Sequence, residues 1–201
     1  MKYKLAAILL AGGLSRRMGG GDKNLIFLGG RPLLLHVLDR IDLAKMPTMI
    51  NANGDPARYE GFGLPVCADV IEGHVGPLAG ILTGFEWVRE SYPECTHMVS
   101  LATDAPFLPH DLISRLAAGL DGDADIVQAM SCDRRHPVFA IWSVELADDL
   151  RTAVCIEGIR KIDDFTDRHN CVTVAFSGDP DPFMNLNRPE DFERAQMLFG
   201  V

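Results

Sequence analysis

The chain has 201 residues, of which 47% are hydrophobic and 23% charged, and its formal net charge at pH 7 is −9. This length and composition are typical of one water-soluble globular domain. The acidic balance argues against a nucleic-acid polymer as a partner, because such binding depends on a basic surface. No apolar run approaches the roughly 20 residues of a membrane-spanning helix, so no membrane association is expected. The five cysteines form no Cys-x-x-Cys pair, which favours free thiols and predicts a cytoplasmic protein.

Apolar runs and their boundaries predict that strands and helices alternate along the chain. Strands are expected at residues 5–10, 25–28 (a short piece), 48–51, 63–69, 97–102, 125–129 and 138–142. Helices are expected at about 32–44, from 55 (a short one), at 76–90, 110–120 and 144–154, and from 189. Such alternation predicts an α/β fold with a mostly parallel sheet and helices on both faces. Residues 1–201 show no linker or repeat, which predicts a single domain.

A glycine-rich segment, LLAGGLSRRMGGGDK at residues 9–23, follows the first predicted strand. Its glycines let the backbone turn tightly, and Arg17 and Lys23 add positive charge, which together favour a polyphosphate ligand. The segment is not a Walker A motif, because Asp22 precedes the lysine and Asn24 follows it, and it lacks the Gly-x-Gly-x-x-Gly pattern. A glycine loop with solvated cations is the alternative.

Four candidate functional residues follow predicted strands: Gly12, Asn51, Asp69 and Asp104. Ligands of open parallel sheets bind beyond the carboxyl ends of the strands, so we expect these residues to share one site. Asp104 offers a carboxylate to a hard cation such as Mg²⁺, or it caps the turn that follows it. Asn51 and Asp69 either contact a nucleotide base or only form turns at strand ends.

The glycine-rich segment also carries a family resemblance. Leu10-Ala-Gly-Gly-x-Ser-x-Arg-Met-Gly, with the following Asp22-Lys23, resembles the signature of the nucleotidyltransferases related to molybdenum cofactor guanylyltransferase. Gly13 and the Asp22-Lys23 pair resemble the guanylyl branch more than the cytidylyl branch. The resemblance continues nearly to the end of the chain.

Two later segments extend the resemblance. Thr-Asp-Ala-Pro-Phe-Leu-Pro at 103–109 resembles the family's Cys-Asp-x-Pro-Phe-Leu/Ile-Pro, whose aspartate binds the metal, and Thr103 replaces the usual cysteine. Asn-Leu-Asn-Arg-Pro-Glu-Asp at 185–191 resembles the family's Asn-x-Asn-Thr-Pro-Glu-Asp, with Arg188 in place of threonine. The segment 76–80 resembles the loop that contacts the base, although it is also an ordinary proline helix start.

The resemblance implies a Rossmann-like three-layer α/β/α nucleotidyltransferase fold that transfers GMP from GTP to molybdopterin and releases diphosphate. It implies that residues 1–110 bind GTP and residues 111–201 bind molybdopterin. Mg²⁺, with Mn²⁺ as an alternative, would bind Asp104, and cofactor-insertion proteins or molybdoenzyme chaperones would be partners. The implied catalytic residues are Arg17, Lys23 and Asp104. The implied GTP-binding residues are Leu10, Ala11, Gly12, Lys23, Asn51, Asp69, Gly76, Pro77 and Asp104, and the implied molybdopterin-binding residues are Arg160, Asn185 and Asn187.

Several alternatives stay open at this point. Asp69 can accept the two N–H donors of guanine's Watson–Crick edge, which cytosine lacks, but a CTP-dependent enzyme acting on molybdopterin or on a sugar or alditol phosphate is the main alternative. A non-catalytic nucleotide-binding partner is another. A solvated helix arginine is the more common state for a residue such as Arg160. No Ser/His/Asp or Cys/His arrangement stands out at a useful spacing, which argues against a hydrolase with a covalent nucleophile.

Overall fold

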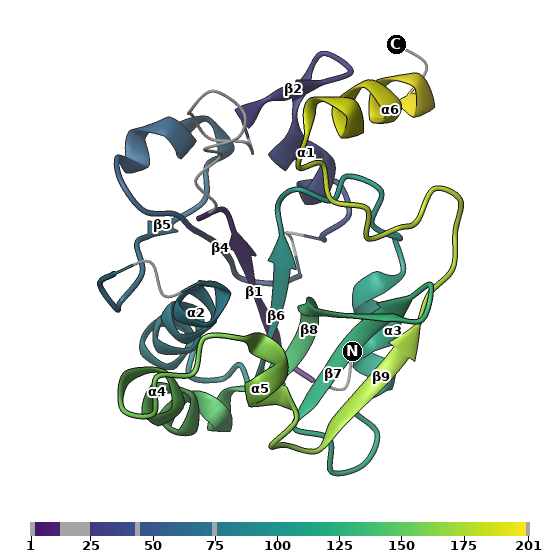
Figure 1. Cartoon of the computed structure of the whole chain (residues 1–201). Helices are drawn as coiled ribbons and strands as arrows, with labels where there is room; N and C mark the ends of the chain where they lie inside the picture. Colours follow the sequence, from purple (N-terminus) through teal and green to yellow (C-terminus); the bar gives the residue numbers. More distant parts are fainter. Residues whose placement is uncertain (1–2, 13–24, 43–44, 74–75, 200–201) are drawn as a thin grey trace.

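In the computed structural model, which describes residues 3–12, 25–42, 45–73 and 76–199, seven strands form the main sheet. They are β1 (Leu5–Leu10), β4 (Thr48–Asn51), β5 (Val66–Cys67), β6 (His97–Ala102), β7 (Ile126–Ser131), β8 (Arg134–Ser143) and β9 (Cys171–Ala175). Their order across the sheet is β5-β4-β1-β6-β8-β7-β9 (Figure 1). Strands from both halves of the chain therefore share one sheet.

Every neighbouring pair in this sheet is parallel except the two pairs that involve β8. A two-residue turn at Cys132 and Asp133, both with positive φ (48° and 58°), joins β7 to β8. Such a turn reverses the chain directly, so β8 must run antiparallel to β7. The prediction of a mostly parallel sheet is confirmed.

Helices cover both faces of the sheet (Figure 1). The α-helices are α1 (Leu33–Leu38), α2 (Pro77–Ser91), α3 (Leu112–Ala118), α4 (Ala147–Cys155), α5 (Ile162–Thr166) and α6 (Pro189–Phe199), and the 3₁₀ helices are η3 (Pro56–Phe62) and η4 (Val144–Leu146). In the described ranges no helix combines the length and the apolar character needed to cross a membrane.

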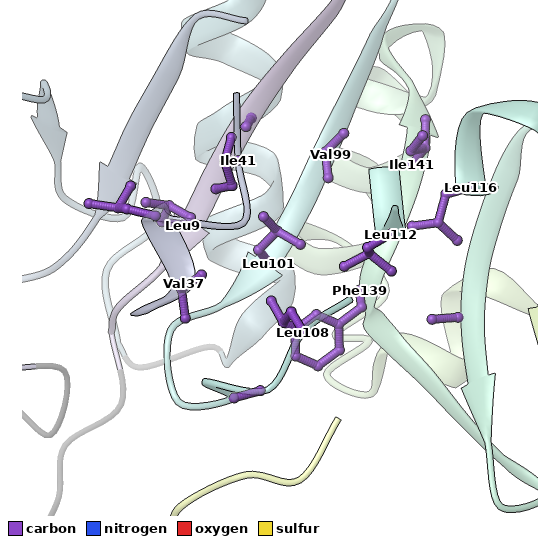
Figure 2. Packing of buried hydrophobic residues seen from close by; sticks show 14 of the residues in the cluster. Leu9, Val37, Ile41, Val99, Leu101, Leu108, Leu112, Leu116, Phe139 and Ile141 are labelled. Carbon is purple, nitrogen blue, oxygen red and sulfur yellow. The ribbon is translucent and has the colours of Figure 1, made fainter. Parts of the chain in front are cut away.

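The side chains of β1 alternate between two hydrophobic clusters, as the two-residue period of a strand requires. Leu5, Ala7 and Leu9 pack with residues of α1 and α3, whereas Ala6 and Ile8 pack with residues of α2 and α4. Figure 2 shows the first cluster, in which Leu9, Val37 and Ile41 lie on one side and Leu112, Leu116 and Phe139 on the other. Both faces of the sheet are therefore buried, which gives the three layers expected from the sequence.

A third, smaller cluster joins the two ends of the chain. The hairpin of β2 (Phe27–Leu28) and β3 (Arg31–Pro32) contributes Leu28, which packs with Leu33, Leu186 and Phe192. Helix α6 consequently lies beside this hairpin (Figure 1).

The helix expected at 32–44 is shorter than predicted. Helix α1 ends at Leu38, and tight turns follow in which Arg40 and Ile41 donate to the carbonyls three residues earlier. The Asp39 carboxylate pairs with Arg31 at 2.8 Å, which holds the chain at this end of α1. Ile41 still packs into the core, although it lies beyond the end of the helix.

Other predicted elements also differ from the structure. The helix expected at 144–154 is divided into η4 and α4, because a 3₁₀ turn precedes the regular helix. The strand expected at 63–69 contains only the two paired residues of β5. The sequence did not predict α5 or β9, and β8 begins four residues earlier than expected.

Candidate active site at the carboxyl edge of the sheet

The register of the parallel strands places four strand ends at one level. Leu10 lies opposite both Asn51 and Ala102, and Asn51 lies opposite Cys67. Two further hydrogen bonds fix this edge: the Ala11 N–H donates to the Asn51 carbonyl at 2.9 Å, and the Thr103 hydroxyl donates to the Leu10 carbonyl at 3.2 Å. The candidate residues that follow these strands therefore share one edge of the sheet.

The cations of the glycine-rich segment lie outside the described residues. Arg17 and Lys23 belong to the range 13–24, so their roles stay predictions. Leu10 ends β1, Ala11 follows it, and the exposed Gly12 is the last described residue before that range. The backbone at Gly12 leaves the sheet between the ends of β4 and β6.

Asp69 is held by two asparagines. Its Oδ1 accepts a hydrogen bond from Asn51 Nδ2 at 2.9 Å, and its Oδ2 accepts one from Asn53 Nδ2 at 2.7 Å. The backbone N–H of Asp69 donates to Asn53 Oδ1 at 2.9 Å, so Asn53 and Asp69 are joined twice. Asn51 also donates to the Cys67 carbonyl at 3.2 Å and is only 3% exposed. Its side chain therefore links the Cys67 carbonyl to the Asp69 carboxylate.

Helix α2 begins beside this cluster. Gly76, directly before Pro77, has φ 84° and ψ −167°, a conformation that is almost confined to glycine. Pro77 occupies the first helical position, where its missing N–H has no cost. The Val70 N–H donates to the hydroxyl of Thr83 on α2 at 3.0 Å. The segment after Asp69 is therefore anchored to the helix that Gly76 and Pro77 start.

Gly80 lets α2 pass very close to Asn51. A Cβ atom at position 80 would lie 2.4 Å from Asn51 Oδ1 and 2.6 Å from a methyl carbon of Leu10. Only glycine permits this approach without a shift of its neighbours. The helix thus presses on the side of Asn51 that does not face Asp69.

Asp104 follows β6 at the same edge and is partly buried, with its Oδ1 atom inaccessible to solvent. Carboxylate oxygen suits a hard cation, which usually binds to one or two carboxylates and completes its shell with water and substrate phosphates. Within the described ranges no group of three or more His, Cys, Asp or Glu side chains could hold a metal ion. Asp104 offers one carboxylate at this edge, which suits a cation that a phosphate-bearing substrate also binds.

The loop that carries Asn185 and Asn187 crosses this edge. The Leu186 N–H donates to the Asp104 carbonyl at 2.9 Å, which places the two exposed asparagines next to the candidate metal ligand. At the start of α6, the Asp191 carboxylate accepts the N–H groups of Asn187 and Arg188 at 2.8 Å each. This carboxylate fixes the end of the loop, and its negative charge stabilises the N-terminus of α6.

A Ser131–His136–Asp181 cluster fixes the other end of the same loop. The Ser131 hydroxyl donates to Asp181 Oδ1 at 2.7 Å and lies 2.8 Å from His136 Nε2. Because a hydroxyl has one proton, His136 Nε2 must be the donor in the second pair. Burial lowers the pKa of His136, although Asp181 opposes that shift, and its ring stacks on Phe183. Serine bridges the other two groups, so the cluster is not arranged for a serine nucleophile, in which histidine is the bridge.

Arg160 approaches the site through its backbone. Its carbonyl oxygen would lie 3.8 Å from a Cβ at Gly76, so the loop between α4 and α5 lies near the start of α2. The guanidinium Nη1 donates to the carbonyls of Val154 and Ile159 at 2.9 Å each. One part of this exposed side chain therefore caps the end of α4, and its role toward a pterin stays a prediction.

Sequence reasoning missed Asn53 and the Ser131–His136–Asp181 cluster. The sequence pattern could have identified Asn53. Residues i and i+2 at a strand end point to the same side, and Asn51 was already a candidate. Ser131 and Asp181 are 50 residues apart, and no local pattern signals their contact.

Comparisons with known proteins agree with this architecture. Residues 7–172 match the MobA-like NTP transferase domain. Molybdenum cofactor guanylyltransferase of Rhodopseudomonas palustris (strain BisB5) is 49% identical over 96% of this chain and 92% of its own length. The crystal structure of molybdopterin-guanine dinucleotide biosynthesis protein A from Archaeoglobus fulgidus superposes with a TM-score of 0.77 at 26% identity, covering 97% of this chain and 98% of that chain.

A protein of Mycobacterium tuberculosis, solved as a complex with manganese, shares the fold, with a TM-score of 0.71 at 17% identity over 96% of this chain and 98% of that one. The match to the domain and the identity to a relative of nearly equal length decide the family. The chain belongs to the molybdenum cofactor guanylyltransferases, nucleotidyltransferases built on the MobA-like NTP transferase domain.

Proposed function

We propose that this protein transfers GMP from GTP to the terminal phosphate of molybdopterin, releasing diphosphate and forming molybdopterin guanine dinucleotide. The observation that carries the proposal is the row of strand ends at the carboxyl edge, with Asp69 after β5 and Asp104 after β6. Relatives of nearly equal length that carry the name of this activity support it.

The order of the strands suggests how GTP lies. Three interstrand spacings separate β5 from β6, or about 14 Å. The guanine would lie near Asp69, whose carboxylate suits the N1–H and N2–H donors of guanine's Watson–Crick edge. The triphosphate would then extend over the end of β1, where the glycine-rich segment begins, toward Asp104. The base and the reacting phosphates are thus assigned to opposite ends of the row.

The proposed reaction is a direct displacement. An oxygen of the molybdopterin phosphate forms a bond to the α-phosphorus of GTP, and the bond from that phosphorus to the bridging α–β oxygen breaks. Diphosphate leaves with the electron pair. The attacking phosphate is already anionic, so the protein contributes position and charge neutralisation rather than a strong base. Arg17 and Lys23 would bind the oxygens on which negative charge collects.

Asp104 is the residue proposed to hold a divalent cation, with Mg²⁺ expected and Mn²⁺ as the second ion to test. Such a cation neutralises phosphate charge when it is bound. The residues proposed for molybdopterin are Arg160, Asn185 and Asn187. Residues up to about 110 would accordingly serve GTP, and residues from about 111 would serve the acceptor. Cofactor-insertion proteins or molybdoenzyme chaperones are the proposed protein partners.

A competition between GTP and CTP tests the proposal. Purified protein is supplied with molybdopterin, Mg²⁺ and both nucleotides, and the dinucleotide product is identified by mass spectrometry. The proposal predicts the guanine dinucleotide with one diphosphate released per product. A cytosine dinucleotide would contradict the assignment of the base, and nucleotide binding without any diphosphate release would indicate a binding partner instead of an enzyme.

A further inference from the structure

We propose that Asn53 is a positioning residue that sets the preference for guanine by fixing the orientation of the Asp69 carboxylate. The inference rests on the proposed function and adds to it a residue that does not itself touch the nucleotide. Two asparagines, Asn51 and Asn53, donate hydrogen bonds to the carboxylate of Asp69.

Asn53 and Asp69 form a reciprocal pair. Asn53 Nδ2 donates to Asp69 Oδ2 at 2.7 Å, while Asn53 Oδ1 accepts the Asp69 backbone N–H at 2.9 Å. One amide therefore binds both the main chain and the side chain of Asp69, which limits rotation about the bonds between them. A single hydrogen bond would leave that rotation open.

The backbone of Asn53 is itself hydrogen-bonded to Arg58. Its carbonyl accepts a hydrogen bond from Arg58 Nη2 at 2.6 Å, and Arg58 Nε donates to the Asp55 carbonyl at 2.8 Å. The Asp55 side chain accepts the Ala57 N–H at 3.0 Å and so caps η3. The first turn of η3 is therefore hydrogen-bonded to the backbone of Asn53.

Asn51 completes the arrangement on the other oxygen. Its Nδ2 donates to Asp69 Oδ1 at 2.9 Å, and Gly80 of α2 closely approaches the far side of its amide. Each oxygen of Asp69 thus accepts one N–H from an asparagine among the described residues. A carboxylate oxygen can accept two such bonds, so both oxygens can also accept a donor from a ligand. Two adjacent acceptors suit the N1–H and N2–H groups of guanine.

Inosine triphosphate provides the direct probe. It retains the N1–H group of GTP but lacks the 2-amino group. The ratio of the dissociation constants of ITP and GTP therefore reports on the contact between the 2-amino group and Asp69 Oδ2, the oxygen that Asn53 binds. If Asn53 fixes that oxygen, Asn53→Ala reduces the preference for GTP over ITP by roughly tenfold, the effect of about one well-made hydrogen bond to a charged group. ITP affinity itself changes much less.

The measurement is calorimetric titration of the full chain with each nucleotide and Mg²⁺, so no turnover is needed. Asn53→Asp serves as a second variant, because it retains the acceptor for the Asp69 N–H but places a second carboxylate against Asp69 Oδ2. It should lower the preference at least as much as Asn53→Ala. The matched control is Asn170→Ala, since the Asn170 side chain donates to the Asp123 carbonyl at the opposite end of the sheet.

A variant that is partly unfolded does not obscure the result, because the ratio compares two ligands on the same preparation. If Asn53→Ala and Asn53→Asp retain the GTP-to-ITP ratio of the unaltered protein, the inference is wrong. It is equally wrong if the unaltered protein binds GTP without preferring it to ITP. Binding of neither nucleotide by the unaltered protein would instead refute the proposed function, so the two failures can be told apart.

Discussion

The backbone N–H of Leu186 donates a hydrogen bond to the carbonyl oxygen of Asp104 at 2.9 Å. These two residues are far apart in the sequence, yet the bond joins the loop of the proposed acceptor residues to the proposed metal ligand. Any movement of that loop is therefore transmitted to the backbone of Asp104. The geometry provides a physical link between the two halves of the proposed site.

Removing the Ser131 hydroxyl tests how the loop is anchored. Ser131→Ala leaves Asp181 and His136 without their shared partner, and we expect the loop that carries Asn185 to lose its fixed position. The KM for molybdopterin should rise about fivefold to thirtyfold, because one or two hydrogen bonds worth about 1 kcal/mol each are lost. The KM for GTP should be unchanged. Steady-state kinetics with each substrate varied separately measures this, and an equal rise for both would contradict the assignment of the loop to the acceptor.

Adding a methyl group at Gly80 tests the contact with Asn51. A new Cβ 2.4 Å from Asn51 Oδ1 must displace an amide that two hydrogen bonds hold, so Gly80→Ala should lower the free energy of unfolding by about 1–3 kcal/mol. The gain in helix propensity, about 1 kcal/mol, offsets part of this cost, so the net decrease should be at most about 2 kcal/mol. Urea denaturation measures the change, and calorimetry should show weaker binding of GTP.

Gly61→Ala is the matched control for that experiment. Gly61 lies in η3, and nothing lies within 4 Å of a Cβ at this position. Its replacement should leave stability and GTP affinity nearly unchanged. If both variants behave alike, the close approach of α2 to Asn51 has no energetic importance.

Features that depend on neighbouring residues in the sequence could be predicted, whereas contacts between residues far apart in the sequence could not. The ends of β1 and β6 were predicted correctly, because β1 is a continuous apolar run, β6 is mostly apolar, and both are buried in the sheet. The edge strand β9 was missed, although its two valines and one threonine are residue types that favour strands. Strand ends also indicated Asn51, Asp69 and Asp104, whereas the contact of Leu186 with Asp104 depends on tertiary folding that no local pattern encodes.

The cysteines give a prediction about pH. Burial is the main cause that raises the pKa of the Cys171 thiol from 9.0 to about 11, whereas Cys132 and Cys155 are exposed. Because the thiolate is the reactive form, iodoacetamide at pH 8 should label Cys132 and Cys155 well before Cys171. Mass spectrometry of the labelled peptides measures the order, and equal labelling of Cys171 and Cys155 would contradict it.

The same shift has a consequence for stability. The folded protein holds the Cys171 proton more tightly than the unfolded chain, so this contribution is fully present below pH 9 and is lost as the pH rises toward 11. Denaturation midpoints recorded across that range should therefore fall. The denaturation midpoint of Cys171→Ala should fall less steeply over the same pH range.

Product formation by the unaltered protein and by Asp104→Ala, each supplied with purified molybdopterin, GTP and Mg²⁺, tests whether the protein transfers GMP and whether Asp104 is needed. Mass spectrometry quantifies the dinucleotide, and a coupled assay quantifies diphosphate. Transfer of GMP from GTP, with Asp104 as the metal ligand, predicts equal amounts of molybdopterin guanine dinucleotide and diphosphate from the unaltered protein. It predicts almost none from Asp104→Ala, which should still bind GTP in part. Full activity of Asp104→Ala, or no dinucleotide from the unaltered protein, would contradict it.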